Sequence, residues 1–242
     1  MPFTGKTICL LLLHAAFLLL TASCSTEDAD GMEMYPPATS DGSTESSLAI
    51  GTLKLMEEND YYFALDEGSK LYPEDTTAIH GYRLIDGQRA FILFRLMEMK
   101  RTGYDYCAQV LKIENILTKE TYPMPAEKAD SIGNDPIEIT EAWASAEHLN
   151  IQYSFYYTPQ MNTAHMLSLV ANLDGETEDA AGRPCLEFRH NAFGDTAGGT
   201  KRQGIVSFAL RSVEEMLKGK STLCLRHYGS GAERKETMIT LD

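Results

Sequence analysis

Alternation of apolar and polar residues with a period of two is the feature that most constrains this chain. From Leu149 to Phe155 every second residue is apolar and the residues between them are polar. Successive side chains of a strand point to opposite faces of a sheet, so this pattern predicts a strand with one buried face. Similar runs recur through the second half of the chain, separated by turn residues. The chain is therefore expected to be all-β.

The second half of the chain contains seven such runs in about 115 residues. This number of strands is expected of an immunoglobulin-like β-sandwich. Ser212-Val213-Glu214-Glu215 has the pattern of a capping box and predicts one or two turns of helix. Trp143 is expected to be buried in the core. The predicted strands are Ile137–Trp143, Leu149–Phe155, His165–Asn172, Cys185–His190, Gly204–Arg211, Thr222–Tyr228 and Glu236–Leu241.

The first half has shorter strands and no pattern typical of a long helix. Asp66-Glu67-Gly68 predicts a hairpin turn, with glycine where a positive φ is required. Several strands in about 75 residues favour a small, closed or nearly closed barrel of the OB type. The expected strands are Leu48–Met56, Tyr61–Leu65, Ser69–Tyr72, Arg89–Met99 and Tyr104–Ile113. Pro123 and Pro125 interrupt strand pairing, so 48–124 and 125–242 are predicted to be separate folding units.

The N-terminus has the pattern of a lipoprotein signal. Lys6 precedes an apolar run, Ile8–Leu20, which is too short to span a membrane. Leu20-Thr21-Ala22-Ser23-Cys24 resembles a bacterial lipobox, which predicts removal of residues 1–23 and acylation of Cys24. The alternative is an ordinary signal peptide in which Cys24 has no such role. Residues 24–47 are rich in acidic and small polar residues, so we expect a disordered tether.

Charge and cysteine content exclude several classes of function. The net charge is −14 at pH 7, so the chain lacks the basic surface that nucleic-acid binding requires and no nucleic-acid partner is expected. Strand phase places Cys185 and Cys224 on the outer faces of their strands, and His190 and His227 on the inner faces. This phase argues against a zinc site and against a core disulfide between the two cysteines. We expect no metal and no cofactor.

Two groups of residues are candidates for ligand binding. In the barrel, tyrosines and basic residues occur together, Lys100 and Arg101 among the latter. OB-type faces bind oligosaccharides or oligonucleotides by stacking and hydrogen bonding. In the sandwich, Asn191 and Asp195 either bind a ligand or hydrogen-bond the backbone of their own turn. The candidates in the barrel are Tyr62, Tyr104, Tyr106 and Arg95.

Catalytic motifs are missing from the sequence. It contains no nucleophile elbow, HExxH or P-loop pattern, so we expect no catalytic residues. The leading hypothesis is a non-catalytic binding module whose ligand is a glycan, a peptide or an envelope protein. The alternative is a hydrolase that acts on envelope glycans.

Several segments, in this order, resemble the NigD-like lipoproteins of Bacteroidales. The resemblance implies an N-terminal OB-like domain followed by a C-terminal β-sandwich. It also suggests an association with a bacteriocin gene cluster, so a role in immunity is a third hypothesis. Together with the lipobox, it predicts an outer-membrane lipoprotein of the cell envelope, held in the membrane by the lipid on Cys24. The acidic stretch Ser25–Asp30 either resembles the export tag of surface lipoproteins or belongs to an ordinary solvated tether. The segments are the lipobox, Leu71–Pro73, Gly103–Tyr106, Asp130–Ile137, Leu186–Asp195 and Val206–Arg211.

The first prediction concerns the anchor. Replacing the acylated thiol in Cys24→Ala should abolish lipid attachment and membrane association, because stable attachment needs two or more acyl chains. Radiolabelled fatty acid incorporation and membrane fractionation measure both effects. Cys107→Ala is the matched control and should keep the label. A Cys24→Ala protein that is still labelled would contradict the assignment.

Overall fold

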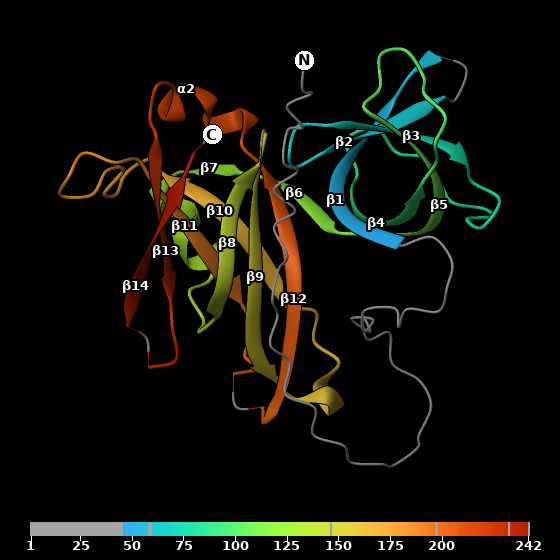
Figure 1. The fold of residues 1–242 in the computed structure, drawn as a ribbon. Coiled ribbons are helices and arrows are strands. Elements are labelled where there is room, and N and C mark those ends of the chain that lie inside the picture. Colours follow the sequence, from blue (N-terminus) through green and yellow to red (C-terminus); the bar gives the residue numbers. More distant parts are fainter. Residues whose placement is uncertain (1–45, 58–59, 146, 197, 232, 242) are drawn as a thin grey trace. The chain divides into compact units, whose positions relative to one another are not determined.

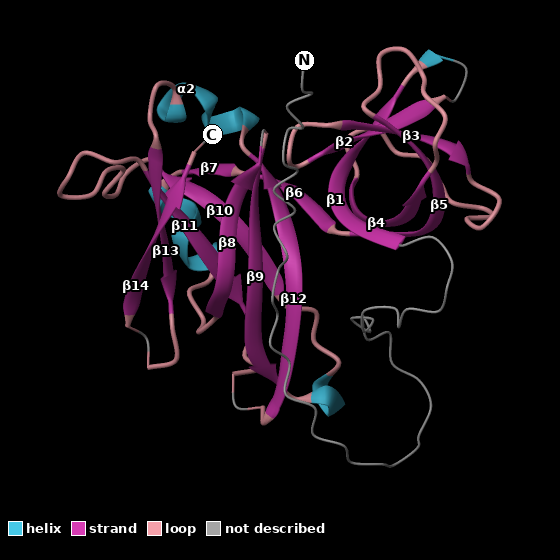
Figure 2. Cartoon of the chain, in the orientation of Figure 1, coloured by secondary structure: helices cyan, strands magenta, loops and turns pink. Residues whose placement is uncertain are grey.

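The computed structural model describes residues 46–57, 60–145, 147–196, 198–231 and 233–241. Strands make up most of these residues (Figure 2), which confirms the all-β prediction. The helical turns are short: Ala126–Lys128, α1 (Ala129–Ile132), Pro159–Met161, Arg211–Val213 and α2 (Glu214–Leu217). No helix in the described ranges is long and apolar enough to cross a membrane. The predicted signal peptide and Cys24 lie outside the described residues.

The first five strands form a closed barrel (Figure 1). Its order is β1-β2-β3-β5-β4, in which β3 and β5 are parallel and β4 pairs with both β1 and β5. The strand residues that point inward are apolar and fill the barrel interior. Phe63, Leu71 and Ile92 are among them, and all three are 0% exposed. The OB-type prediction is confirmed. The strands are β1 (Ser46–Leu55), β2 (Tyr61–Leu65), β3 (Lys70–Asp75), β4 (Arg89–Leu96) and β5 (Tyr106–Asn115).

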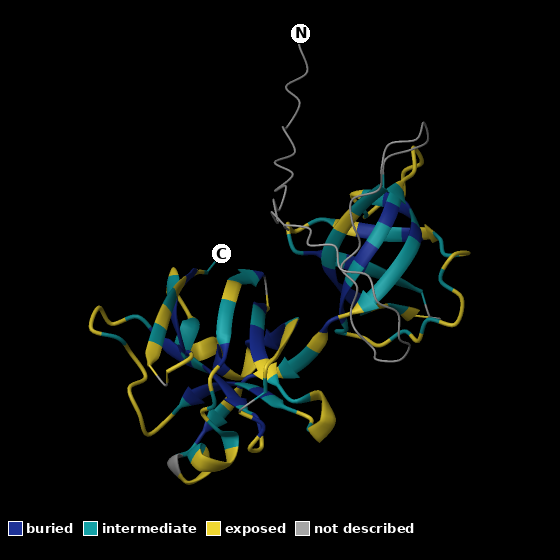
Figure 3. Ribbon diagram, turned by 90° about the horizontal axis from the view of Figure 1, so that it is seen from below, coloured by how far each residue is buried: buried dark blue, intermediate teal, exposed yellow. Residues whose placement is uncertain are grey.

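The following strands form the two sheets of a β-sandwich, which confirms the second part of the predicted fold. One sheet has the order β14-β13-β11-β10-β7 and the other β6-β12-β9-β8. Residues of both sheets, including Leu149, Phe188 and Phe208, make one buried core, and buried segments alternate with more exposed ones along the strands (Figure 3). The strands are β6 (Leu117–Glu120), β7 (Tyr122–Met124), β8 (Glu138–Ser145), β9 (His148–Tyr157), β10 (Met166–Asn172), β11 (Cys185–Asn191), β12 (Thr200–Ala209), β13 (Thr222–Tyr228) and β14 (Arg234–Thr240).

Two sandwich strands were not expected from the sequence. β6 pairs in parallel with β12, and β7 pairs in parallel with β10, each at the edge of its sheet. Pro123 lies within β7, opposite Ala171. A proline has no N–H to donate, and an edge strand tolerates it because only one side is paired. The sequence argument against a central strand therefore holds, but it does not exclude an edge strand.

The prediction that Trp143 is buried in the core is wrong. A β-bulge between Ile139 and Glu141 inserts one residue into β8 relative to β9. The bulge reverses the alternation of faces, so Ala142 and Ala144 pack against the core. Trp143 consequently lies on the other face of the strand and is half-buried.

The predicted capping box is also wrong, although a helical turn does form at this place. No side chain caps the N-terminus of α2. The hydroxyl of Ser212 instead donates a hydrogen bond of 2.6 Å to the carbonyl oxygen of Thr121. Ser212 therefore connects this turn to the segment between β6 and β7.

Cys185 and Cys224 lie opposite each other on the neighbouring parallel strands β11 and β13. Leu186 and Leu225, the residues that follow them, belong to the sandwich core, so both cysteines face away from it, as predicted. Both are nevertheless buried, and both are free thiols. Burial raises the pKa of the Cys185 thiol to about 12, so this cysteine remains protonated and unreactive at neutral pH.

Arg89 is the largest of the fully buried side chains and connects strands of the barrel and the sandwich. Its guanidinium makes a bidentate ion pair with Asp66, with N–O distances of 2.5 and 2.8 Å. It also donates to Asn150 Oδ1 on β9 at 2.9 Å and to Ser207 Oγ on β12 at 3.2 Å. A bond to Thr52 Oγ1 at 3.2 Å uses the remaining N–H. All five donors of the guanidinium are therefore satisfied.

The second prediction tests this buried charge. Asp66→Ala should lower the free energy of unfolding by about 3 kcal/mol, because it leaves a buried guanidinium without its counter-charge. Urea denaturation of the full chain measures the change. The control is Lys54→Ala, which removes an exposed ion pair with Glu147 and should cost about 1 kcal/mol or less. Equal effects of the two substitutions would contradict the role of Arg89.

The third prediction follows from His148 at the start of β9. Burial, and secondly the charge of Arg89, lower its pKa from 6.5 to about 4. Between these two pH values the unfolded chain binds a proton that the folded chain does not. The free energy of unfolding should therefore fall by up to about 3 kcal/mol as the pH is lowered through this window.

His148→Gln should remove this part of the pH dependence, as measured by urea denaturation at a series of pH values. The control, His80→Gln, replaces an exposed histidine and should leave the pH dependence unchanged. An unchanged pH dependence in His148→Gln would contradict the assignment.

Candidate functional site

The outer surface of β2 and β3 carries a cluster of aromatic and basic side chains. Phe63 and Leu71 point into the barrel, so their neighbours Tyr62 and Tyr72 point outward. Met56 and Asp60, between β1 and β2, and residues 97–105, between β4 and β5, adjoin this surface through contacts described below. Strands 2 and 3 with these two loops are the surface on which OB folds bind oligosaccharides and oligonucleotides.

Three tyrosine rings and two cations meet on this surface, which we call the tyrosine face (Tyr62, Tyr72, Tyr104, Lys70 and Arg101). The ring centroid of Tyr104 lies 5.7 Å from that of Tyr62 and 5.0 Å from that of Tyr72. The guanidinium carbon of Arg101 is 3.8 Å from the centroid of Tyr72, and Lys70 Nζ is 5.6 Å from that of Tyr62. These distances are typical of aromatic and cation–π pairs.

Side chains of the loop between β1 and β2 fix the rings in place. Tyr72 donates its hydroxyl to Asp60 at 2.9 Å, and Tyr104 donates to Met56 Sδ at 3.1 Å. Burial and the hydrogen bond to Asp60 raise the pKa of Tyr72, so its phenol remains a donor. Arg101 lies 3.8 Å from Asp60. The rings are therefore oriented before any ligand binds, which reduces the entropy cost of binding.

The structure brings together some of the predicted barrel residues. Tyr62 and Tyr104 belong to the tyrosine face. Tyr106 instead packs against the barrel core. Arg95 lies on β4, which is separated from β2 and β3 by β1 on one side and β5 on the other.

The sequence candidates do not include Tyr72 or Lys70, whereas Arg101 is one of the basic residues noted beside the tyrosines. Because Tyr72 follows Leu71, which faces inward, the alternation along the strand predicts that Tyr72 faces outward. The position of Arg101 depends on the path of its loop, which no local pattern specifies.

Asn191 and Asp195 lie in the sandwich and hydrogen-bond neighbouring segments. Asn191 donates to the carbonyl oxygen of Ser131 and accepts from the backbone N–H of Phe193. Asp195 is 1% exposed, and both its carboxylate oxygens accept from the backbone N–H of Thr158 at 3.0 Å. Only the bond between Asn191 and Phe193 lies within one turn, whereas Ser131 and Thr158 belong to segments that are distant in sequence.

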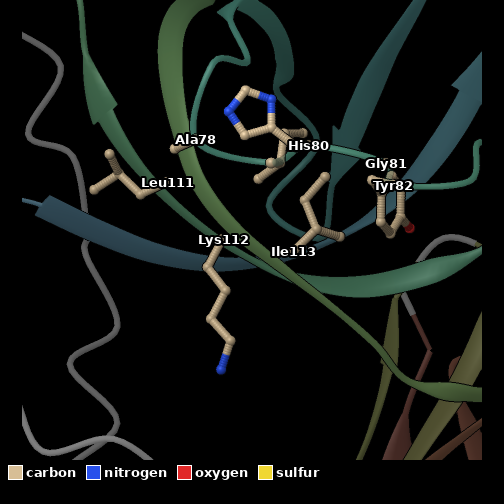
Figure 4. A pocket seen from close by; sticks show the side chains of 8 residues that line it. Ala78, His80, Gly81, Tyr82, Leu111, Lys112 and Ile113 are labelled. Carbon is tan, nitrogen blue, oxygen red and sulfur yellow. The ribbon is translucent and has the colours of Figure 1, made fainter.

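A recess elsewhere on the barrel has a volume of about 280 Å³ (Figure 4). Its lining comes from residues 78–82 and 111–113, and a neighbouring recess of about 200 Å³ shares Ile79, Gly81 and Tyr82. Neither lining includes an aspartate or a glutamate, and neither shares a residue with the tyrosine face. Among the described residues, no group of three or more His, Cys, Asp or Glu side chains is arranged to hold a metal ion.

Fold and surface together define a class: an all-β protein in which an OB-type barrel with an aromatic face precedes a β-sandwich. The model of the NigD-like N-terminal OB domain matches residues 50–116, and that of the NigD-like C-terminal beta sandwich domain matches residues 120–241. The chain belongs to the NigD-like family, as the sequence resemblance indicated. No curated protein matches it.

Several crystal structures have a similar fold. A protein of unknown function from Bacteroides vulgatus is 23% identical with a TM-score of 0.69, covering 81% of this chain and 91% of that one. A toxin-related protein from Parabacteroides distasonis is 28% identical with a TM-score of 0.67, covering 82% and 94%. A NigD-like immunity protein from Bacteroides caccae is 14% identical with a TM-score of 0.53, covering 84% and 100%. None of these three names describes an enzyme.

Proposed function

We propose that the protein is a non-catalytic binding module of the cell envelope, and that it binds an oligosaccharide on the tyrosine face. The arrangement of Tyr62 on β2, Tyr72 on β3 and Tyr104 in the loop between β4 and β5 of an OB-type barrel supports this proposal most directly. The lipobox at Cys24 supports attachment to the outer membrane, with the barrel and sandwich presented at the surface.

The chemistry of the tyrosine face favours a sugar. Tyrosine rings offer flat apolar surfaces, and Arg101, Lys70 and Asp60 offer donors and acceptors at their edges. The side chains of Arg101 and Asp60 are 45% and 39% exposed, so both are within reach of a ligand that covers the rings. The net charge of −14 disfavours nucleic acids, the other common ligand of OB faces.

A hydrolase is a weaker alternative for this surface. Glycosidases place two carboxylates on either side of the scissile bond, about 5–10 Å apart. Asp60 and Glu74 both lie near Arg101, at 3.8 and 3.7 Å, and Asp60 also accepts the hydrogen bond of Tyr72. We infer that these carboxylates position the rings and the cation.

The fourth prediction tests the tyrosine face on an oligosaccharide array, followed by calorimetric titration of any glycan bound. Tyr72→Ala and Tyr104→Ala should each weaken binding about thirtyfold, because truncating a central aromatic residue of a binding site costs about 2 kcal/mol. The control is Tyr156→Ala, which removes a 55% exposed tyrosine of the sandwich strand β9.

Glycan affinity that is unchanged in both variants of the tyrosine face would contradict the proposal, as would binding of a peptide library but of no glycan. Circular dichroism confirms that each variant is folded before it is titrated.

A further inference from the structure

Two histidines and an aspartate form a continuous hydrogen-bonded chain inside the sandwich. His165, just before β10, has its Nδ1 atom 2.9 Å from Nε2 of His190 on β11. The other nitrogen of His165, Nε2, lies 3.3 Å from Asp195 Oδ2. The other nitrogen of His190, Nδ1, lies 3.0 Å from the carbonyl oxygen of Pro136. All four ring nitrogens therefore have a partner within the protein.

The hydrogen-bonded chain of His190, His165 and Asp195 is enclosed by protein. The side chains of His165 and Asp195 are 4% and 0% exposed, and His190 is 2% exposed. Phe155 of β9 covers both imidazoles, with its centroid 4.5 Å from His165 and 4.8 Å from His190. Groups buried in this way must satisfy one another, because an unpaired buried polar atom is costly.

The hydrogen-bonded contacts of His165 and His190 need more N–H hydrogens than two neutral imidazoles carry. The carbonyl oxygen of Pro136 and the carboxylate of Asp195 can only accept. His190 must therefore carry a hydrogen on Nδ1, His165 must carry one on Nε2, and a third must lie between the two rings. Two neutral imidazoles supply only two hydrogens. The three contacts consequently require one additional proton.

The surrounding groups decide which atom holds this proton. Two hydrogen bonds from Thr158, more than any other cause, lower the pKa of Asp195, so its carboxylate is ionised. Burial is the main cause that lowers the pKa of His190, so this ring stays neutral. The other carboxylate that acts on His190 is Asp135, which also accepts a hydrogen bond from the backbone N–H of Ala192. Strand β9 contributes the uncharged ring of Phe155.

We propose that this hydrogen-bonded chain of side chains is a proton-binding site in which His165 is a buried imidazolium. It donates through Nε2 to Asp195 and through Nδ1 to His190, while His190 donates through Nδ1 to Pro136. The bound proton joins three segments: the loop between β9 and β10, strand β11, and the loop between β11 and β12.

Loss of this proton would break one of these contacts. If His165 kept its hydrogen on Nδ1, a lone pair on Nε2 would face the carboxylate of Asp195. The turn at Asp195 also contains Phe193, which is 57% exposed and has a positive φ of 51°. A non-glycine residue in this conformation persists only where its surroundings hold it. The proton therefore helps to fix the turn that presents this exposed ring.

Long-range ¹H–¹⁵N correlation of the histidine rings in the full chain, near neutral pH, tests the proposal. The wild type should show His165 with hydrogens on both nitrogens and His190 as the Nδ1–H tautomer. Asp195→Asn should cause His165 to lose one of its two hydrogens. Asp135→Asn, which changes the other nearby carboxylate, is the matched control and should leave His165 doubly protonated.

The wild-type spectrum decides the question even if Asp195→Asn fails to fold. A neutral His165 in the wild type, or His165 still doubly protonated in Asp195→Asn, would overturn the proposal. The readout is independent of ligand binding on the tyrosine face, so either proposal can fail without the other.

Discussion

The structure depends on one buried cation. Arg89 begins β4 of the barrel, yet its guanidinium lies against Asn150 and Ser207, which are directly opposite each other on β9 and β12. Burying a charge is costly unless hydrogen bonds replace all of its hydration. Hydrogen bonds replace the hydration of Arg89, because Asp66 supplies the counter-charge and the remaining N–H groups donate to oxygen atoms on strands of the barrel and of the sandwich. The polar residues of this network thus meet the hydrogen-bonding requirement of a charge that would be costly to bury alone.

The tyrosine face follows from the closure of the barrel. A closed barrel of five strands has a small interior that apolar side chains fill, so ligands must bind outside it. The outward residues of β2 and β3 include Tyr62 and Tyr72, and the loops beside them supply Tyr104, Arg101 and Asp60. Because hydroxyl groups and ring contacts fix the rings, the surface is prepared for a ligand before it binds. The sandwich has polar groups at Asn191 and Asp195, but Asn191 is bonded to Ser131 and Phe193, and Asp195 to Thr158 and His165.

One set of buried polar groups in the sandwich satisfies its own hydrogen-bonding requirement. His165, His190 and Asp195 satisfy one another in one chain of contacts, and the fold obtains a complete set of hydrogen bonds by holding a proton there. The thiols of Cys185 and Cys224 need no such partners, since a cysteine behaves as a small apolar residue when it is protonated. The sheet can therefore bury a histidine where it has hydrogen-bond partners, and a protonated thiol that does not require them.

The sequence by itself determined the fold class and named two tyrosines of the tyrosine face, Tyr62 and Tyr104. Alternation along Leu149–Phe155 and the turn at Gly68 are local signals, because strand phase and turn geometry depend on adjacent residues.

Only the tertiary structure decided the face of Trp143, the pairing of β7, the partners of Arg89 and the contact of His165 with Asp195. Bulges and edge pairing depend on the neighbouring strand, and Arg89 meets Asn150 across 61 residues of sequence. Such partners are selected by the packing of the whole chain, which no local periodicity encodes.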